Sequence, residues 1–209
     1  MRKADWYFDF ISPFAYFAWL RLGEFSDRLE IRHRPILFAG LLNHWGQKGP
    51  AEMAPKRAWT YRWCAWWAAE HAIEFRFPAR HPFNPLPYLR LAIAAGNTPQ
   101  AIDTIFKTLW TTGADAADEQ VLRGLMESLR VDADALAAAE VKEALRSATQ
   151  GALEQGVFGV PTLVIDNELF WGADAMGFAA AYLADPAIIA TAEMQRIAAL
   201  PIGVMRKPG

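Results

Sequence analysis

The chain has 209 residues, of which 53% are hydrophobic, and a formal net charge of −2. This length allows one compact body or two closely packed lobes with a sizeable core, whereas the nearly neutral charge argues against nucleic acid as a partner. A single cysteine, Cys64, excludes an intramolecular disulfide framework and is typical of a reducing compartment. Asp5 and Asp9 interrupt the apolar region that a signal peptide would need, and no apolar stretch is long enough to span a membrane. We therefore expect a soluble, cytoplasmic protein.

The first 35 residues predict a β-α-β unit. Residues 5–11 form an apolar, aromatic run typical of a buried strand. Ser12 is a good helix N-cap and Pro13 a good first helical residue, which predicts a helix that ends near Phe25. Strict alternation of apolar and charged residues over 29–34 indicates a second strand with one buried face.

The middle of the chain, from about residue 37 to residue 155, is predicted to be helical. Helical periodicity between start and stop signals predicts helices over residues 55–72, 88–95, 99–112, 118–130 and 134–156. The first of these carries four tryptophans at helical spacing: Trp59, Trp63, Trp66 and Trp67. We interpret them as a buried interface between lobes or, alternatively, as the wall of an aromatic-substrate site. Cys64 lies among them and is expected to be buried and inert. The histidines show no paired ligand spacing, so we expect no metal site.

After residue 157 the composition changes again. Residues 160–165 are β-branched and apolar, Asp166-Asn167 predicts a turn, and residues 168–171 predict a second short strand before an Ala-rich helix. This hairpin and helix complete the β-α-β start. The sequence predicts an α/β, thioredoxin-like fold split by an all-helical insertion. The thioredoxin-like domain is expected to comprise residues 1–36 and 157–209, and the helical insertion residues 37–156.

The segment Ser12-Pro13-Phe14-Ala15 has the layout of a thioredoxin-type active site: a strand, a tight turn and the first turn of a helix. Redox proteins of that fold carry Cys-x-x-Cys here. With Ser and Ala at those positions, the site cannot carry out thiol–disulfide exchange. What remains is a hydroxyl at a helix N-terminus, where N–H groups and the helix dipole stabilise an anion. We interpret Ser12 as a group that stabilises the thiolate of a bound molecule or, alternatively, as a plain N-cap.

Two separated motifs, residues 8–16 (FDFISPFAY) and 158–162 (FGVPT), resemble those of the 2-hydroxychromene-2-carboxylate isomerases. These enzymes are relatives of kappa-class glutathione transferases and of periplasmic disulfide oxidoreductases. Further matches at residues 48–50, 82–86 and 170–174 extend the resemblance over nearly the whole chain. It implies a glutathione-dependent isomerase that converts an aromatic 2-oxo acid of the 2-hydroxychromene-2-carboxylate type to its trans-o-hydroxybenzylidenepyruvate isomer, by reversible addition of the glutathione thiolate. It also implies a homodimer.

The resemblance implies roles for individual residues. Ser12 corresponds to an active-site serine that donates a hydrogen bond to the glutathione sulfur. Val160-Pro161 corresponds to a cis-proline loop whose backbone pairs with glutathione like an added strand, and an ordinary strand-initiating proline is the alternative. The γ-glutamyl end is expected to contact Trp171, Gly172, Ala173 and Asp174. The substrate is expected to contact Phe14, His44, Lys48, Lys56 and Asn84. A capping role for Asp174 and a turn role for Asn84 are the alternatives.

Two other functions stay open at this point. A kappa-like glutathione transferase would use the same site and release a conjugate. A non-catalytic thioredoxin-like module would use the exposed backbone near Val160 to hold a peptide. The hydroxyl of Ser12 favours an enzyme, because a peptide-binding module has no need of a group that stabilises a thiolate.

Overall fold

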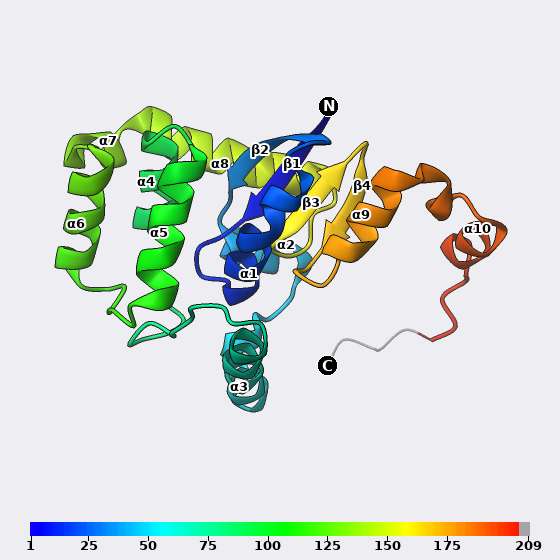
Figure 1. The fold of residues 1–209 in the computed structure, drawn as a ribbon, viewed down its shortest axis with the longest axis horizontal. Coiled ribbons are helices and arrows are strands. Elements are labelled where there is room, and N and C mark those ends of the chain that lie inside the picture. The colour runs from blue at the N-terminus through cyan, green and yellow to red at the C-terminus, as the bar shows by residue number, and fades with distance from the viewer. Residues whose placement is uncertain (205–209) are drawn as a thin grey trace.

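The sheet is assembled from two distant parts of the chain. The computed structural model describes residues 1–204, so positions 205–209 of the predicted segment 157–209 lie outside the described residues. The sheet has the order β2-β1-β3-β4, with β1 parallel to β2 and antiparallel to β3 (Figure 1). Its strands are β1 (Arg2–Phe8), β2 (Leu29–Pro35), β3 (Thr162–Ile165) and β4 (Glu168–Trp171).

The first strand lies three residues earlier than the apolar run over 5–11 predicts. β1 ends at Phe8, and the chain then turns toward α1 (Pro13–Leu22). Asp9 causes the early end, because its carboxylate accepts the N–H of Ile11 at 3.1 Å and its C=O accepts the N–H of Ser12 at 3.1 Å. This turn places Ser12 directly before the first residue of α1.

Helices cover both faces of the sheet. On one face, Trp6 and Phe8 of β1 are fully buried and pack in a large aromatic core with α1, with α5 (Pro99–Thr111) and with α9 (Met176–Ala184). On the other face, Tyr7 and Val164 pack in a smaller cluster with α2 (Phe38–Trp45) and α8 (Ala139–Glu154). Alternate residues of β1 thus face different helical layers, as strand geometry requires.

Most of the helices expected between residues 37 and 156 are present. Figure 1 shows the group from α4 to α7 standing beside the sheet. The predicted helix over 134–156 is two helices, because Ala138 adopts an extended conformation between them. Residues 38–45, for which no individual helix was predicted, form α2. The remaining helices are α3 (Ala54–Glu70), α4 (Leu86–Ala94), α6 (Glu119–Leu129), α7 (Ala133–Ala137) and, not predicted, α10 (Ala192–Ala198).

The domain limits at 36 and 156 stay a prediction. The C-terminal half of α8 lies in the cluster on the sheet, so contacts between the two predicted parts are extensive. None of the helices within residues 1–204 combines the length and apolarity needed to cross a membrane.

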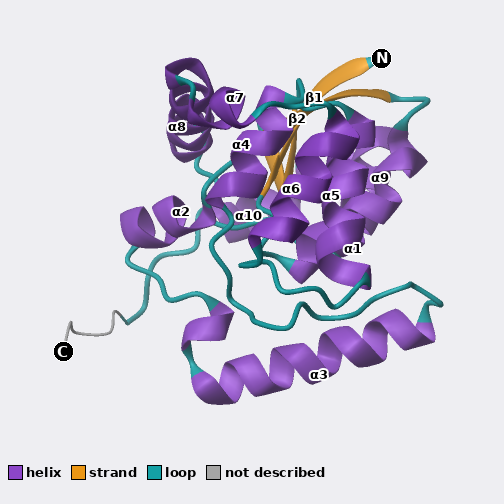
Figure 2. Cartoon of the chain, turned by 90° about the vertical axis from the view of Figure 1, so that its left-hand side faces the viewer, coloured by secondary structure: helices purple, strands orange, loops and turns teal. Residues whose placement is uncertain are grey.

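Helix α3 lies across one side of the molecule, away from the sheet (Figure 2). The residues that it buries are small and recur every fourth position: Thr60, Cys64 and Ala68. Trp59 and Trp66 are instead 58% and 54% exposed, so the prediction of a buried tryptophan interface is wrong for these two. Small side chains let the helix approach the body closely, and the large indoles are left at its flanks. Cys64 is buried as predicted, and burial raises the pKa of its thiol to about 12.

Candidate functional site

A cavity of about 440 Å³ lies where the turn before α1 meets the loop before β3, α2 and α3. This volume is in the range of small-molecule sites. Apolar side chains such as Phe14, Phe38 and Phe158 form much of its wall, and a small number of polar groups lie among them. The other segments that line it are the loop 47–52, the loop 81–85 and Trp171.

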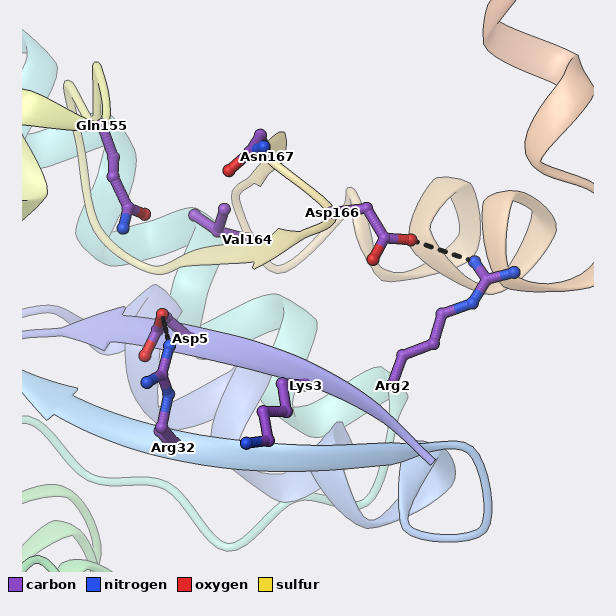
Figure 3. Close-up of a pocket in the computed structure, with 8 residues that line it drawn as sticks. All are labelled: Arg2, Lys3, Asp5, Arg32, Gln155, Val164, Asp166 and Asn167. Atoms are coloured by element: carbon purple, nitrogen blue, oxygen red, sulfur yellow. Dashed lines mark hydrogen bonds and ion pairs between the residues drawn. The ribbon is translucent and has the colours of Figure 1, made fainter.

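A second cavity, of about 300 Å³, lies on the sheet near the start of β1 and differs in chemistry. Figure 3 shows Asp5 directed at Arg32 and Asp166 directed at Arg2. Asp5 also accepts a hydrogen bond from Arg34 at 2.8 Å. Both carboxylates of this cavity are therefore already paired with guanidinium groups, and we place the functional site in the larger cavity.

Ser12 satisfies both interpretations of its role. It lines the larger cavity, and its Oγ accepts the N–H of Ala15 at 3.2 Å, which makes it the N-cap of α1. An N-cap uses a lone pair of the hydroxyl and not its proton. Among residues 1–204 no acceptor takes that proton. The cap therefore fixes the oxygen and leaves the O–H free to donate to a ligand.

The loop before β3 offers unpaired backbone groups to the same cavity. The Val160–Pro161 peptide bond is cis, which confirms the prediction. The C=O of Pro161 accepts the N–H of Gly172 at 2.9 Å. By contrast, neither the N–H nor the C=O of Val160 forms a hydrogen bond within the described part of the chain. Val160, which lines the same cavity as Ser12, thus has one unpaired backbone donor and one unpaired backbone acceptor.

The indole of Trp171 covers this loop. A Cβ at Gly159 would lie 2.4 Å from its Nε1, so only glycine allows the indole to approach the backbone this closely. The ring also packs edge-on against Phe158, with 5.1 Å between centroids. Trp171 nevertheless remains 54% exposed and lines the cavity. It forms an aromatic wall beside the free backbone of Val160.

Asp9 is a site residue that was not predicted from the sequence. Its carboxylate is fully buried, lines the cavity, and accepts the N–H of Phe38 at 2.9 Å in addition to that of Ile11. It therefore ties the turn before Ser12 to the start of α2. Burial raises the pKa of Asp9 to about 7, although both hydrogen bonds favour the charged form.

Tyr61 and His81 are two further residues that the sequence analysis did not identify. Both line the cavity, and the Tyr61 hydroxyl lies 2.5 Å from Nδ1 of His81. Nε2 of His81 lies 2.8 Å from the C=O of Ile11. Burial lowers the pKa of His81 and raises that of Tyr61. The pair connects α3 to the turn before Ser12.

Of the residues predicted to contact the substrate, three line the cavity: Phe14, Lys48 and Lys56. Neither lysine forms an ion pair within residues 1–204, so both ammonium groups are available to an anion. His44 and Asn84 are not among the lining residues. His44 lies in the last turn of α2, and Oδ1 of Asn84 accepts the N–H of Leu86 at 3.1 Å, as a turn residue does.

Of the residues predicted to hold the γ-glutamyl end of glutathione, some line the cavity and others do not. Trp171 lines the cavity, whereas Gly172, Ala173 and Asp174 follow it and do not, nor does Pro161. Gly172 has a φ of +99°, and a Cβ there would lie 2.3 Å from Oδ1 of Asp174. The carboxylate of Asp174 thus lies against the Gly172 backbone, close to the cavity's edge at Trp171. The Ala-rich helix after this loop, predicted over residues 172–183, starts at Met176.

Comparisons with known proteins show the family of the chain. A family model described as a DSBA-like thioredoxin domain matches residues 3–184. The 2-hydroxychromene-2-carboxylate isomerase of Sphingobium xenophagum is 33% identical over 88% of this chain and 99% of its own length. That of Pseudomonas putida is 30% identical over 82% of this chain and 89% of its own. A kappa-class glutathione transferase of Caenorhabditis elegans is 25% identical over 88% and 93%.

Solved structures show the same fold. A 2-hydroxychromene-2-carboxylate isomerase superposes with a TM-score of 0.77 at 24% identity, over 92% of this chain and 98% of that one. The cytosolic disulfide reductase DsbM of Pseudomonas aeruginosa, solved with GSH, superposes with a TM-score of 0.58 at 16% identity, over 93% and 99%. The predicted α/β, thioredoxin-like fold with inserted helices is thereby confirmed.

Proposed function

We propose that this chain, an isomerase of the 2-hydroxychromene-2-carboxylate isomerase family within the DSBA-like thioredoxin domains, uses glutathione to interconvert geometric isomers of an aromatic 2-oxo acid. The observation that carries the proposal is the Ser12 hydroxyl, which is fixed by its capping bond in an apolar cavity and retains a free proton. The relatives' names supply the substrate class: a 2-hydroxychromene-2-carboxylate or a close analogue.

The residues around Ser12 fit a peptide thiol. Val160 has an unpaired N–H and C=O that a γ-glutamyl-cysteinyl backbone can use as an added strand. Gly159 leaves room for the Trp171 indole to flank such a backbone. We propose that Gly172, Ala173 and Asp174, with Pro161, complete this binding region at its outer edge. The disulfide reductase DsbM was solved with GSH on the same fold, which supports glutathione as the thiol here.

The chain's own groups have distinct tasks in the proposed reaction. Glutathione, when bound, supplies a thiolate that adds reversibly to a conjugated carbon of the substrate. Ser12 donates its hydrogen bond to the sulfur and stabilises the anion, and the N-terminus of α1 adds its dipole. A free thiol has a pKa of about 8.5, so stabilising the thiolate increases the reactive fraction at neutral pH.

The substrate's carboxylate needs a cationic partner, whereas its aromatic ring needs an apolar one. Lys48 and Lys56 line the cavity without an ion pair of their own and are proposed to bind the carboxylate. Phe14 is proposed to pack on the aromatic ring. Contact of His44 and Asn84 with the substrate stays a proposal from the family resemblance, since both lie outside the lining. The homodimer stays a prediction from the family resemblance, and the cytoplasmic location stays a prediction from the composition of the chain.

The test is to incubate the purified protein with 2-hydroxychromene-2-carboxylate and glutathione while absorbance and total free thiol are followed together. A cofactor returns after each turnover, so substoichiometric glutathione supports many turnovers and the thiol titre stays constant. The similarity to a kappa-class transferase favours one alternative, in which one thiol is lost for each product formed. Stoichiometric loss of thiol would move the assignment to that transferase activity.

A further inference from the structure

Tyr61 of α3 and His81 of the loop 81–85 form a hydrogen-bonded pair in the cavity wall, and neither has a role in the function proposed above. We propose that this pair is a catalytic proton relay: the Tyr61 oxygen accepts the proton of the substrate's ring hydroxyl, and His81 holds a proton while the ring opens. The inference rests on the proposed function, since it concerns the ring of the 2-hydroxychromene substrate.

The hydrogen bonds of His81 define its tautomer. Nε2 lies 2.8 Å from the C=O of Ile11, and a carbonyl can only accept, so Nε2 carries the proton. Burial lowers the pKa of His81 below its ordinary 6.5, which keeps the ring neutral at neutral pH. Nδ1 of a neutral ring that is protonated at Nε2 is an acceptor. The Tyr61 hydroxyl, at 2.5 Å, must therefore donate to it.

This direction of donation decides what Tyr61 offers to the cavity. A phenol has one proton, and here Nδ1 of His81 takes it at a shorter distance than the C=O of His81, which lies 2.8 Å away. The remaining lone pairs of the phenol oxygen can accept a hydrogen bond from a ligand hydroxyl. Burial raises the pKa of Tyr61, so the phenol does not ionise by itself and has to give up its proton as it receives another.

The surroundings keep the proton on the pair. The rings of Phe77, Phe83 and Trp110 lie with centroids 5.5 to 5.9 Å from that of His81. The neighbouring cation, Arg80, points to Asp115, with which it forms an ion pair. Aromatic neighbours neither accept nor supply protons at neutral pH. Because Nε2 of His81 is bonded to the C=O of Ile11, Nδ1 is the nitrogen left to exchange a proton, and the Tyr61 hydroxyl is its partner toward the cavity.

The substrate's chemistry needs such a relay. In 2-hydroxychromene-2-carboxylate one ring carbon carries the hydroxyl and the carboxylate and is bonded to the ring oxygen, which makes it a hemiketal. Ring opening breaks the bond from that carbon to the ring oxygen, and the O–H electron pair becomes the new C=O. The hydroxyl proton passes to Tyr61 as the proton of Tyr61 passes to Nδ1 of His81. The imidazolium then returns a proton by the same path to the ring oxygen, which becomes a phenol, and both residues regain their starting state.

The test uses two substrates that differ only in the need for ring opening. The first is 2-hydroxychromene-2-carboxylate, and the second is cis-benzylidenepyruvate, which has no ring hydroxyl and cannot close to a hemiketal. Tyr61→Phe is expected to lose on the order of 10²-fold in kcat on the first substrate and to stay within a few-fold of the wild type on the second. The matched control is Tyr88→Phe, which removes a buried phenol that donates to the C=O of Ala116 outside the cavity; it is expected to change neither rate.

Other outcomes reject the relay. Equal loss on both substrates would show that Tyr61 only supports the fold of the site, and unchanged rates on both would show that it takes no part. A wild-type protein that isomerises neither substrate would reject the proposed function itself. Without reference to activity, nitrogen NMR of the His81 ring is expected to show the Nε2–H tautomer in the wild type, and a proton on Nδ1 at neutral pH would overturn the assignment.

Discussion

The two walls of the cavity differ in how they are built. One wall consists of the turn before α1 and the loop before β3, and its functional groups are a capped hydroxyl and free backbone atoms. The other consists of α3 and the loop 81–85, and its functional groups are side chains bonded to each other, Tyr61 and His81. The first wall has the parts that an anion and a peptide backbone require, and the second has the parts that proton transfer requires.

The site thus separates two tasks. Local turns set the position of Ser12 and Val160, because a cap and a short loop fix them within a few residues. The second wall depends on the packing of α3 against the body, which brings residues 20 positions apart into contact. Changes in the first wall should therefore affect every substrate that uses the thiol, whereas changes in the second should depend on the substrate's hydroxyl.

The largest effect is expected from Ser12→Ala. Loss of the donor to the thiolate should lower kcat about 10²- to 10³-fold, the range measured for removal of one charge-stabilising donor. Because the effect is on the thiolate, it should be the same for 2-hydroxychromene-2-carboxylate and for cis-benzylidenepyruvate. Steady-state kinetics on both substrates at saturating glutathione measure it. Loss restricted to one substrate would show that Ser12 does not act through the thiolate that both substrates need.

The loss of the N-cap has to be separated from the loss of the donor. Ser12 also caps α1, so Ser12→Ala should cost about 1 kcal/mol of stability. Thr98→Ala removes a comparable N-cap at the start of α5, outside the cavity lining. It should show a similar loss in urea unfolding and normal turnover. A fall in turnover in Thr98→Ala would indicate that destabilisation alone explains the result at Ser12.

The second effect concerns Asp9, which joins the first wall to α2. Burial raises its pKa to about 7 from an ordinary 3.8, so between these values the native state holds a proton that the unfolded chain has released. Stability is therefore expected to fall as the pH rises through this range, by up to a few kcal/mol. In Asp9→Asn that fall should disappear, as measured by urea unfolding from pH 4 to 8.

Asp115 provides a control of opposite sign. The hydrogen bond from Arg80 lowers the pKa of Asp115, so its contribution is present above the unfolded pKa and is lost as the pH falls. Asp115→Asn should leave the fall between pH 4 and 7 intact. If Asp9→Asn retains that fall, Asp9 is not the group that titrates.

The contrast between the walls also explains what the sequence could predict. Ser12 followed by Pro13 is a local signal, and it located the first helix and the site within it. Asp9 was missed because it lies in an apolar run that reads as a continuous strand, and only the fold brings the N–H of Phe38 to its carboxylate. His81 and Tyr61 carry no shared motif, since their contact depends on how the loop 81–85 folds back on α3.

A third prediction tests the close packing of the first wall. Gly159→Val would place a Cβ 2.4 Å from Nε1 of Trp171, so the indole or the loop must move. Overpacking of this kind costs about 1–3 kcal/mol, and the displaced loop should raise the Kd for glutathione about tenfold, since each factor of ten is about 1.4 kcal/mol. Calorimetric titration with glutathione measures the affinity. Gly177→Ala, in α9 with no atom near its added Cβ, is the control, and it should bind normally.

The smallest effect is expected at the outer side of the second wall. Trp66 lies on α3 but is 54% exposed, whereas Trp110 is fully buried in the aromatic core and donates its N–H to the C=O of Phe10 at 2.9 Å. A helix full of tryptophans reads as a core element in the sequence, yet α3 buries its small residues instead. Trp66→Ala should therefore change the free energy of unfolding by no more than about 0.5 kcal/mol, and Trp110→Ala should cost about 3–5 kcal/mol.

Because Trp66 does not line the cavity, its removal should also leave kcat and KM unchanged on both substrates. A raised KM in Trp66→Ala would instead make the exposed indole part of the substrate site, and the second wall would extend beyond Tyr61 and His81.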